Sequence, residues 1–525
     1  MQTSACWLLR AGIALLWLIL SGLSQALALR FSVTYPESVF AGPFTGKVVV
    51  YLSRHAEQPR LGPDWFHPEP MYSQKFRDVP PGSPMVIDET ATGFPGKLSQ
   101  LPPGEYRVQA VIDRNLGGRS IGESPGNLYS EAARMRLDPA EDRTIQLVCD
   151  RVVRERRLRE TPRLREVRVV SQMLSRFYGR TTTLNAAVSL PAEWERDPDR
   201  KFPVLYEVPG FGGRHHGGIA ETLRGGEPFI VVRLDPDCPG GHSVFADSAN
   251  NGPWGQALTT ELIPVIEKRF RGVGRPEGRF VTGHSSGGWS SLWLQITYPD
   301  FFGGCWATAP DPVDFRDFLQ INLYQPGENM FYDRAGRRRP LAREGSTPVL
   351  FFKDFSDMER PIRGEQLGSF EYVFSPRGAD GEPMRLWDRD TGAIHSEVAE
   401  AWKKYDIGLI LRTRWPELEP KLRGKIHIYM GDQDTFYLEG AVKLLQQDLK
   451  RLNADAVVEI VPGDHGSMLT PELRARMGRQ MAERYRRALR AAGQDFARPP
   501  ANRQFRSVEL QQGAMRRQVE RRQAQ

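Results

Sequence analysis

From about residue 167 onward, short apolar runs alternate with stretches that have the spacing of amphipathic helices. Strands are predicted at VRVVSQML (167–174), TLNAAVSLP (183–191), 203–208, 228–234, 279–282, GCWAT (304–308), 425–430 and 456–461. Several of these runs are almost continuously apolar, which is typical of strands covered on both faces. The alternation predicts an α/β fold with a doubly wound, mostly parallel sheet and helices on both of its faces.

The chain before this region has a different pattern. Residues 29–150 lack helical periodicity and contain strand-like runs at 31–35, 46–53, 105–113 and 144–149, separated by turns rich in Gly and Pro. We expect an N-terminal module resembling a small antiparallel β-sandwich. The charged stretch 151–166 is then predicted to be a connector, so that the α/β domain spans 167–492. Two domains suit a chain of 525 residues.

The first 28 residues have the pattern of a secretory signal peptide. Arg10 is followed by a run of 13 mostly apolar residues and by Ala26-Leu27-Ala28, a small-residue cleavage pattern. A bilayer-spanning helix needs about 20 apolar residues, so an uncleaved anchor is the less favoured reading. The pattern predicts export, either to a periplasm or to the outside of the cell.

Export places cysteines in an oxidising compartment. The mature chain would keep Cys149, Cys238 and Cys305, a set that permits at most one internal disulfide. Cys149 with Cys238 is the first pair to test, because Cys305 lies in a predicted buried strand. The alternative prediction, that all three thiols are buried and unpaired, is equally well supported.

The net charge of +7 is concentrated at one end of the chain. From Arg474 onward there are 14 Arg and 4 acidic residues, whereas the rest of the mature chain has more acidic than basic residues. Residues 493–525 form a Gln/Arg-rich, low-complexity tail of the kind that does not fold alone. The charge therefore does not indicate nucleic-acid binding. The tail is either solvated or in weak contact with anionic surfaces.

A long insertion interrupts the α/β alternation between residues 313 and 424. We expect it to lie over the carboxyl edge of the sheet, where α/β proteins bind ligands. Its aromatic side chains would either line a substrate pocket or form a small core of their own. They are Phe351, Phe352, Phe355, Phe370, Tyr372, Phe374 and Trp387.

The segment GHSSG (283–287) lies between a predicted strand and a predicted helix. It fits the G-x-S-x-G pattern, in which a sharp turn exposes the central serine and the flanking glycines allow close approach of neighbouring backbone. Ser285 is therefore the candidate nucleophile. The backbone N–H of Ser286, at the start of the helix, is a candidate donor to an oxyanion.

A serine nucleophile requires a base, and the base requires an acid that orients it. His465 follows the predicted strand 456–461, and Asp432 and Asp434 follow the strand 425–430. All three leave the carboxyl ends of strands, at the edge where Ser285 lies. We favour Asp434 over Asp432, because the residue three past Gly431 has left the strand and can turn toward the histidine.

A second oxyanion donor is expected in the glycine-rich loop after the strand 203–208. The backbone N–H of Phe211, in PGFGG (209–213), is the candidate. His215 and His216 follow closely, but no third ligand has the spacing of a metal site, so a polar loop at the pocket rim is the favoured reading. No metal or organic cofactor is implied by this set of residues.

From about Val167 to Leu489 the chain resembles the putative esterase family of α/β-hydrolases, which includes esterase D, feruloyl and enterochelin esterases and mycolyltransferases. The resemblance rests on LNAAVSLP, FPVLYEVPGFGG, ELIPVIEKRFR, VTGHSSGGWSSLWLQITYPDFFGG, IYMGDQDTFYL and PGDHGSM, in the family's order. It implies an α/β-hydrolase fold and a Ser285–Asp434–His465 triad. The chain departs from the family in one respect: Pro209-Gly210 stands where members usually have His-Gly before the oxyanion residue.

The combined expectation is an exported serine esterase that cleaves carboxylic esters through an acyl-enzyme. An acyltransferase that passes the same acyl group to a sugar or lipid is the first alternative. A non-catalytic cell-surface binding protein on a hydrolase scaffold is the second, and a peptidase is the third. The sequence leaves the ester substrate, free or polymer-linked, and the oligomeric state open.

Overall fold

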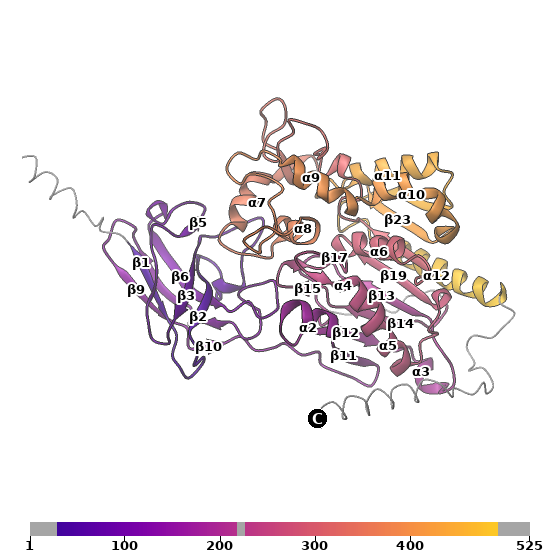
Figure 1. Ribbon diagram of the computed structural model, residues 1–525, viewed down its shortest axis with the longest axis horizontal. Coiled ribbons are helices and arrows are strands. Elements are labelled where there is room, and N and C mark those ends of the chain that lie inside the picture. The colour runs from indigo at the N-terminus through magenta and orange to yellow at the C-terminus, as the bar shows by residue number, and fades with distance from the viewer. Residues whose placement is uncertain (1–28, 218–225, 492–525) are drawn as a thin grey trace, which may run out of the picture.

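The computed structural model describes residues 29–217 and 226–491, so the predicted signal peptide (1–28) and the tail (493–525) lie outside the described residues. The described chain forms an N-terminal β-domain and a larger α/β domain that lie side by side along the longest axis of the molecule (Figure 1). No helix within the described ranges is long and apolar enough to cross a membrane.

Two sheets make up the N-terminal β-domain. One has three strands in the order β4-β1-β9, and the other has seven, in the order β10-β7-β6-β2-β3-β5 with β8 paired to β6. The strands are β1 (Arg30–Thr34), β2 (Phe44–Ser53), β3 (Met71–Val79), β4 (Met85–Ile87), β5 (Thr92–Phe94), β6 (Gly104–Asp113), β7 (Leu128–Tyr129), β8 (Ala133–Leu137), β9 (Thr144–Val148) and β10 (Arg151–Val152).

The expectation of a purely antiparallel module is wrong at one place, since β1 and β9 pair in parallel. The chain leaves the small sheet after β4, builds most of the large sheet and returns as β9. Such a long connection can bring a strand back in either direction, whereas a tight hairpin can only produce antiparallel neighbours.

The α/β domain contains an eight-stranded sheet in the order β11-β12-β14-β13-β19-β20-β23-β24. The strands from β14 to β24 are parallel, and β12 is antiparallel to both of its neighbours. The mostly parallel sheet predicted from the sequence is therefore present. Its strands are β11 (Leu164–Val170), β12 (Thr183–Ser189), β13 (Val204–Val208), β14 (Ile230–Leu234), β19 (Arg279–His284), β20 (Gly304–Thr308), β23 (Ile426–Gly431) and β24 (Ala456–Val461).

Helices and short hairpins connect these strands. The helices are α2 (Gln172–Tyr178), α3 (Glu193–Arg196), α4 (Trp254–Ala257), α5 (Ile263–Phe270), α6 (Ser286–Thr297), α7 (Phe352–Glu359), α8 (Gln366–Phe374), α9 (Ser396–Trp402), α10 (Ile407–Leu422), α11 (Glu439–Arg451) and α12 (Pro471–Ala491). The hairpin strands are β15 (Asp237–Cys238), β16 (Gly241–His242), β17 (Asp247–Ser248), β18 (Gly252–Pro253), β21 (Pro340–Glu344) and β22 (Thr347–Phe351).

The predicted strand 167–174 is wrong in its second half. The strand begins at Leu164, inside the expected connector, and ends at Val170. Ser171 then caps α2, because its side-chain oxygen accepts a hydrogen bond of 3.0 Å from the backbone N–H of Leu174. A serine in this position satisfies a helix N–H that would otherwise lack a partner, so the capping signal outweighs the apolar pattern.

The three cysteines within the described residues are free and buried. Cys149 follows β9 in the N-terminal β-domain, whereas Cys238 lies in β15 and Cys305 in β20. The pair Cys149–Cys238 does not form, and the reading of three unpaired thiols is the one that fits. Burial raises the pKa of the Cys305 thiol to about 12, so this sulfur stays protonated at neutral pH.

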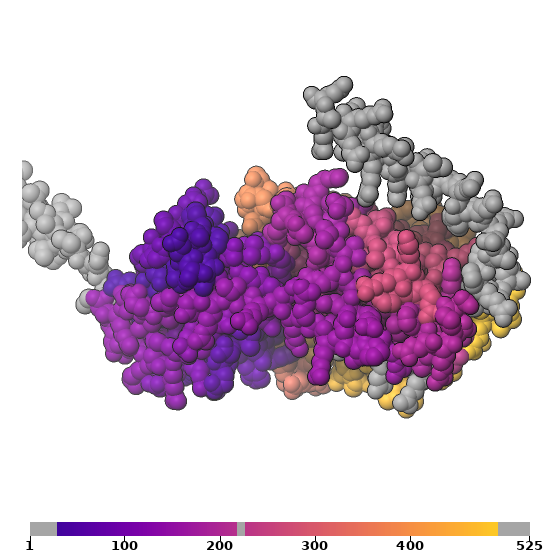
Figure 2. Space-filling view, turned by 90° about the horizontal axis from the view of Figure 1, so that it is seen from below, coloured from indigo at the N-terminus to yellow at the C-terminus, as the bar shows by residue number. Residues whose placement is uncertain are grey.

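The larger sheet of the N-terminal β-domain is buried on both faces. Along β2, Val48 and Val50 pack into that domain's own core, whereas Val49 and Tyr51 belong to the core of the α/β domain. Successive side chains of a strand point to opposite faces, so a single strand serves two cores. The space-filling view shows the two domains in continuous contact (Figure 2).

The insertion 313–424 contains the β21–β22 hairpin and the helices α7 to α10. Helices α7 and α8 lie next to the N-terminal β-domain, whereas α9 lies farther away, toward α10 and α11 (Figure 1). Helix α10 leads directly into β23. It supplies the crossover that a parallel strand requires, so the last part of the expected insertion belongs to the basic α/β pattern.

Candidate active site

Ser285 lies in a sharp turn between β19 and α6. Its backbone has φ 59° and ψ −125°, a conformation that is strained for a residue with a side chain. The glycines of the motif make the turn possible. A Cβ on Gly287 would lie 1.9 Å from the carbonyl oxygen of Val208, and one on Gly283 would lie 2.1 Å from the carbonyl oxygen of Gly287. Only glycine fits at both positions.

His465 and Asp434 meet after two neighbouring strands, β24 and β23. His465 Nδ1 lies 2.7 Å from Asp434 Oδ2, and Asp434 is fully buried. The other carboxyl oxygen, Oδ1, accepts a hydrogen bond of 2.8 Å from the backbone N–H of Phe436. Asp432 instead accepts from the backbone N–H of Gly463 at 3.0 Å, and so stabilises the turn. The structure thus brings Asp434, and not Asp432, to the imidazole.

The pKa of His465 lies above its ordinary value of 6.5. Burial alone would lower this pKa, but the hydrogen bond and charge of Asp434, and the charge of Asp311, raise it by more. The neighbouring His284, whose ring centroid is 4.6 Å from that of His465, has a pKa lowered to about 3, chiefly by burial. The two imidazoles therefore differ: His284 stays neutral at all ordinary pH values, and His465 titrates.

Ser285 and His465 line the same cavity, which has a volume of about 260 Å³. Among the described residues, the hydrogen-bond partner of Ser285 Oγ is Asp311 Oδ1, at 3.4 Å, rather than His465. Apart from a few polar groups, the walls are apolar. The lining residues are Trp65, Gly210, Phe211, His284, Ser285, Asp311, Pro312, Leu319, Leu341, Phe355, Gln366, Leu367, Phe370, Phe436, Leu438 and His465.

Asp311 is a residue of the cavity that the sequence analysis missed. Its Oδ2 accepts hydrogen bonds from Ser286 Oγ at 2.6 Å and from Gln366 Nε2 at 3.2 Å. Burial raises the pKa of this carboxyl to about 6. A signal for it exists in the sequence: Asp311 lies three residues beyond the end of β20, the strand next to β19, at the carboxyl edge of the sheet.

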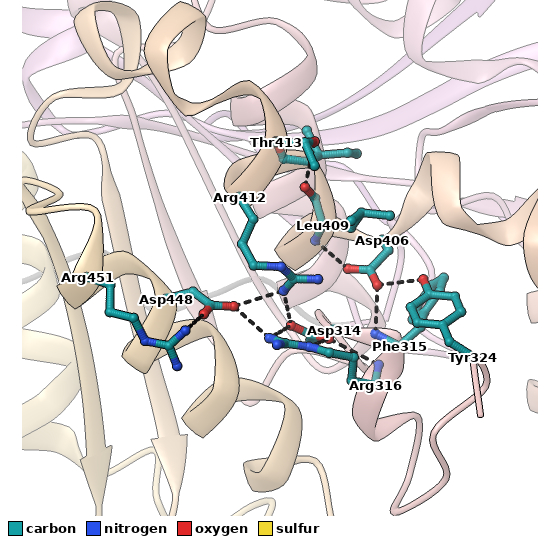
Figure 3. A network of polar contacts seen from close by, with 11 residues as sticks. Asp314, Phe315, Arg316, Tyr324, Asp406, Leu409, Arg412, Thr413, Asp448 and Arg451 are labelled. Atoms are coloured by element: carbon teal, nitrogen blue, oxygen red, sulfur yellow. Dashed lines mark hydrogen bonds and ion pairs between the residues drawn. The ribbon is translucent and has the colours of Figure 1, made fainter.

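A network of ion pairs fixes the segment that follows Asp311 (Figure 3). Asp314, which is fully buried, binds Arg316 and Arg412, each at 2.6 Å. Both guanidinium groups also bind Asp448 of α11, at 2.6 and 2.8 Å. The segment is thereby tied to α10 and α11. Asp311 and Leu319, at either end of this segment, both line the cavity.

The candidate oxyanion donors lie where the sequence placed them. Ser286 is the first residue of α6, where backbone N–H groups have no partner within the helix. The loop that carries Phe211 approaches the turn closely: a Cβ on Gly210 would lie 3.4 Å from the Cβ of Ser285. Phe211 lines the cavity. The Pro209-Gly210 sequence therefore leaves the loop close to Ser285.

His215 belongs to a polar network outside this cavity. Its Nδ1 lies 2.7 Å from Asp235 and its Nε2 lies 2.9 Å from Glu166.

The aromatic residues of the insertion serve both of the roles that the sequence left open, lining a pocket and forming a core. Phe355 and Phe370 line the cavity, whereas others, such as Phe352, Phe374 and Trp387, are buried in the core.

Comparison with curated proteins finds two esterases of Mycobacterium tuberculosis. "Esterase MT1326" (strain CDC 1551 / Oshkosh) and "Esterase Rv1288" (strain ATCC 25618 / H37Rv) are each 32% identical to this chain over 143 residues. The matched segment covers 25% of this chain and 30% of each relative. The chain thus matches less than one third of the length of these relatives.

Solved structures with detectable similarity include a ferulic acid esterase, with 16% identity and a TM-score of 0.35, matched over 61% of this chain and 98% of that one. An S-formylglutathione hydrolase from Agrobacterium tumefaciens has 16% identity and a TM-score of 0.37, over 62% and 98% of the two chains. The fluorophosphonate-binding serine hydrolase FphF of Staphylococcus aureus has 13% identity and a TM-score of 0.37, over 61% and 98%.

A family model described as "Putative esterase" matches residues 180–492, well over half of the chain. The match begins inside the α/β domain, just before β12, and ends immediately after α12. It contains every residue of the Ser285, Asp434 and His465 set. By this match, the chain belongs to the Putative esterase family.

Proposed function

We propose that this chain is an exported serine hydrolase that cleaves carboxylic esters through an acyl-enzyme. One observation carries the proposal. The buried Asp434 holds His465 at the edge of an apolar cavity, and Ser285, in its strained turn, lines the same cavity. A nucleophile, a base and an orienting acid in chain order Ser, Asp, His are the set that an α/β-hydrolase uses.

In the proposed reaction, Ser285 Oγ attacks the acyl carbon and its proton passes to His465 Nε2. The backbone N–H groups of Phe211 and Ser286 bind the oxyanion that forms. His465 then gives the proton to the departing alkoxide, which leaves an ester between Ser285 and the acyl group. Water, deprotonated by His465, attacks this ester and releases the acid. Asp434 keeps the imidazole oriented through Nδ1 in both halves of the reaction.

This reaction requires one rearrangement. Ser285 Oγ, which is 3.4 Å from Asp311 Oδ1, must turn toward His465 Nε2. Catalytic hydrogen bonds are often long or misaligned without substrate and tighten when it binds.

A labelled fluorophosphonate tests the proposal, because it modifies only an activated serine. The wild-type protein and the variant Ser286→Ala, which keeps its backbone N–H, are expected to be labelled. The variant Ser285→Ala is expected not to be labelled. Absence of labelling in the wild type, or equal labelling of Ser285→Ala, would contradict the proposal.

The proposal of export rests on the sequence of residues 1–28. Cleavage after Ala28 would leave Leu29 as the first residue, and Leu29 is already buried in the N-terminal β-domain. N-terminal sequencing of the protein from cells that express the full chain is expected to start at Leu29. A mature protein that starts at Met1 would rule out cleavage. In the exported protein that we propose, the basic tail would contact anionic surfaces outside the cytoplasm.

A further inference from the structure

We propose that the N-terminal β-domain is part of the active site: its Trp65 forms one wall of the cavity and selects esters that carry a large apolar group, such as an aromatic ring, next to the ester bond. The inference deepens the proposed function and rests on it. It names a specificity-determining residue outside residues 180–492, the part of the chain that matches the esterase family.

Trp65 reaches the cavity from the loop between β2 and β3. Both flanking strands belong to the large sheet of the N-terminal β-domain, yet the side chain of Trp65 lines the cavity together with Ser285 and His465. Its ring lies 5.0 Å from that of Phe355 and 5.5 Å from that of Phe211, measured between centroids. These distances are those of aromatic rings in contact.

The indole is also held by a hydrogen bond across the domain boundary. Trp65 Nε1 donates to Glu365 Oε2 at 2.9 Å, and Glu365 is almost fully buried. The next two residues, Gln366 and Leu367, line the cavity. A buried carboxylate is costly unless it is hydrogen-bonded, so Glu365 fixes the position of Trp65 relative to this part of the wall.

A second residue of the N-terminal β-domain, Arg119, strengthens the same contact. Its Nη1 donates to Glu365 Oε1 at 3.1 Å, so both carboxylate oxygens of Glu365, a residue of the α/β domain, bind the N-terminal β-domain. The guanidinium carbon also lies 4.6 Å from the ring centroid of Phe211, within the range of a cation–π contact. Phe211 carries one of the candidate oxyanion amides. The N-terminal β-domain thereby supports two separate parts of the site.

The chemistry of the wall indicates the substrate class. Next to the Ser285 turn, the cavity is lined mainly by aromatic and leucine side chains that come from both domains: Trp65, Phe211, Phe355 and Phe436 form one group, and Leu319, Leu341, Leu367 and Leu438 another. An ester with a ring would bury apolar surface against these side chains, whereas a short ester would leave them in contact with water. The transition state for the larger ester gains most from Trp65.

Three esters measure this preference. Methyl 3-phenylpropanoate has a ring on the acyl side, 2-phenylethyl acetate has a ring on the alcohol side, and ethyl acetate has none. Hydrolysis is followed by titration of the acid released. We expect the wild type to show a higher kcat/KM for at least one ring ester than for ethyl acetate. In Trp65→Ala, this ratio is expected to fall by about 10-fold or more.

Two further variants separate the effect of Trp65 from a folding defect. Phe66→Ala removes the neighbouring ring of the same loop, which is 41% exposed, and is expected to keep the wild-type ratio. Trp65→Phe keeps a ring but loses the N–H that binds Glu365, and is expected to keep most of the ratio. If Trp65→Ala does not fold, the ratio of kcat/KM for the ring ester to that for ethyl acetate is compared between Trp65→Leu and Trp65→Phe. The ratio is expected to be lower in Trp65→Leu.

The outcomes distinguish this inference from the proposed function. A wild-type protein that neither reacts with fluorophosphonate nor hydrolyses any of the esters contradicts the proposed function. A labelled, active wild type whose ring preference is unchanged in Trp65→Ala overturns the inference alone. A wild type that prefers ethyl acetate to both ring esters overturns it as well.

Discussion

Two carboxylates flank the proposed catalytic groups, and their surroundings give them different properties. Asp434 contacts the imidazole of His465 and the backbone N–H of Phe436. Asp311 receives three side-chain hydrogen bonds, from Ser285, Ser286 and Gln366, but has no full positive charge in direct contact, and burial raises its pKa to about 6. At neutral pH, Asp434 orients the base, while Asp311 places a titratable charge close to the nucleophile.

The substitution Asp434→Asn should reduce kcat by about 10³–10⁴-fold. An amide at this position can donate a hydrogen bond to Nδ1 and so favours the tautomer of His465 whose Nε2 cannot accept a proton. Ester hydrolysis with equal amounts of folded protein measures the loss. Asp432→Asn, at the exposed turn, is the matched control and should stay within about 10-fold of the wild type. A reversed order of the two variants would contradict the assignment.

The pH dependence should follow the titration of His465, which must be neutral to accept a proton. The value of kcat/KM is expected to rise with pH through the pKa of His465, with a midpoint above 6.5, because nearby carboxylates raise this pKa. Asp311→Asn removes one of these charges, so the midpoint should move to lower pH. A pH–rate profile of both proteins checks this. A midpoint that stays in place or moves up in Asp311→Asn would contradict it.

At the scale of elements, the turn from β19 into α6 depends on contacts between backbones. The glycines at 283 and 287 let β19, β13 and α6 approach closer than any side chain would allow. This close packing holds Ser285 in its strained conformation, because the surrounding elements leave it no room to relax. The backbone conformation of Ser285 therefore depends on the packing of β13, β19 and α6 against one another.

Gly287→Ala should destabilise the protein by at least about 2 kcal/mol and abolish fluorophosphonate labelling. The added methyl group would meet the carbonyl oxygen of Val208 at 1.9 Å, which forces α6 away from the sheet. Urea unfolding measures the change. Gly117→Ala is the control, since a Cβ there meets nothing within 4 Å. If Gly287→Ala were as stable as the wild type, α6 could move away from β13 without cost, and the prediction would be wrong.

At the scale of the whole molecule, a buried ion pair joins the domains. Arg363, in the insertion, binds Asp113 of β6 through two hydrogen bonds of 2.7 and 2.9 Å. The same guanidinium donates to the carbonyl oxygens of Gly118 and Pro239, at 2.9 and 2.6 Å. Together with the bonds of Glu365 to Trp65 and Arg119, this makes the domain boundary a fixed part of the molecule.

Asp113→Ala should lower the free energy of unfolding by about 3–5 kcal/mol, because it leaves the Arg363 charge buried without its partner. Urea unfolding checks the size of the effect. Arg134→Ala breaks an exposed ion pair with Glu105 in the same domain and should change stability by less than about 1 kcal/mol. Equal effects of the two variants would mean that the buried pair does not hold the domains together.

The same pair predicts a dependence on pH. Burial by itself would raise the pKa of Asp113, but Arg363 lowers it by more, so the pKa lies below 3.8 in the folded protein. As the pH falls, the Asp113 carboxylate therefore takes up a proton at a higher pH in the unfolded chain than in the folded protein. The stabilisation is therefore present above pH 3.8 and is lost as the pH falls through the folded value. Between about pH 5 and pH 3, Asp113→Asn should lose less stability than the wild type.

The class of the α/β domain and the candidate residues could be predicted from the sequence alone. Strands of a parallel sheet are apolar along their length, and a turn with G-x-S-x-G can be recognised locally, so the positions of Ser285, Asp434 and His465 could be predicted. The choice of Asp434 over Asp432 also followed from the sequence, since the residue three past Gly431 is far enough beyond the strand to turn toward the histidine.

Which distant residues line the cavity with Ser285 can be seen only in the folded protein. Asp311 is marked in the sequence only by its place after a predicted strand, and Trp65, which carries no motif, lies 220 residues before Ser285 in the chain. The same holds for the parallel pairing of β1 with β9 and for the free cysteines, which depend on where each domain places its strands. Local spacing is set by the backbone periods of helix and strand, whereas contacts across a domain boundary depend on the packing of whole surfaces.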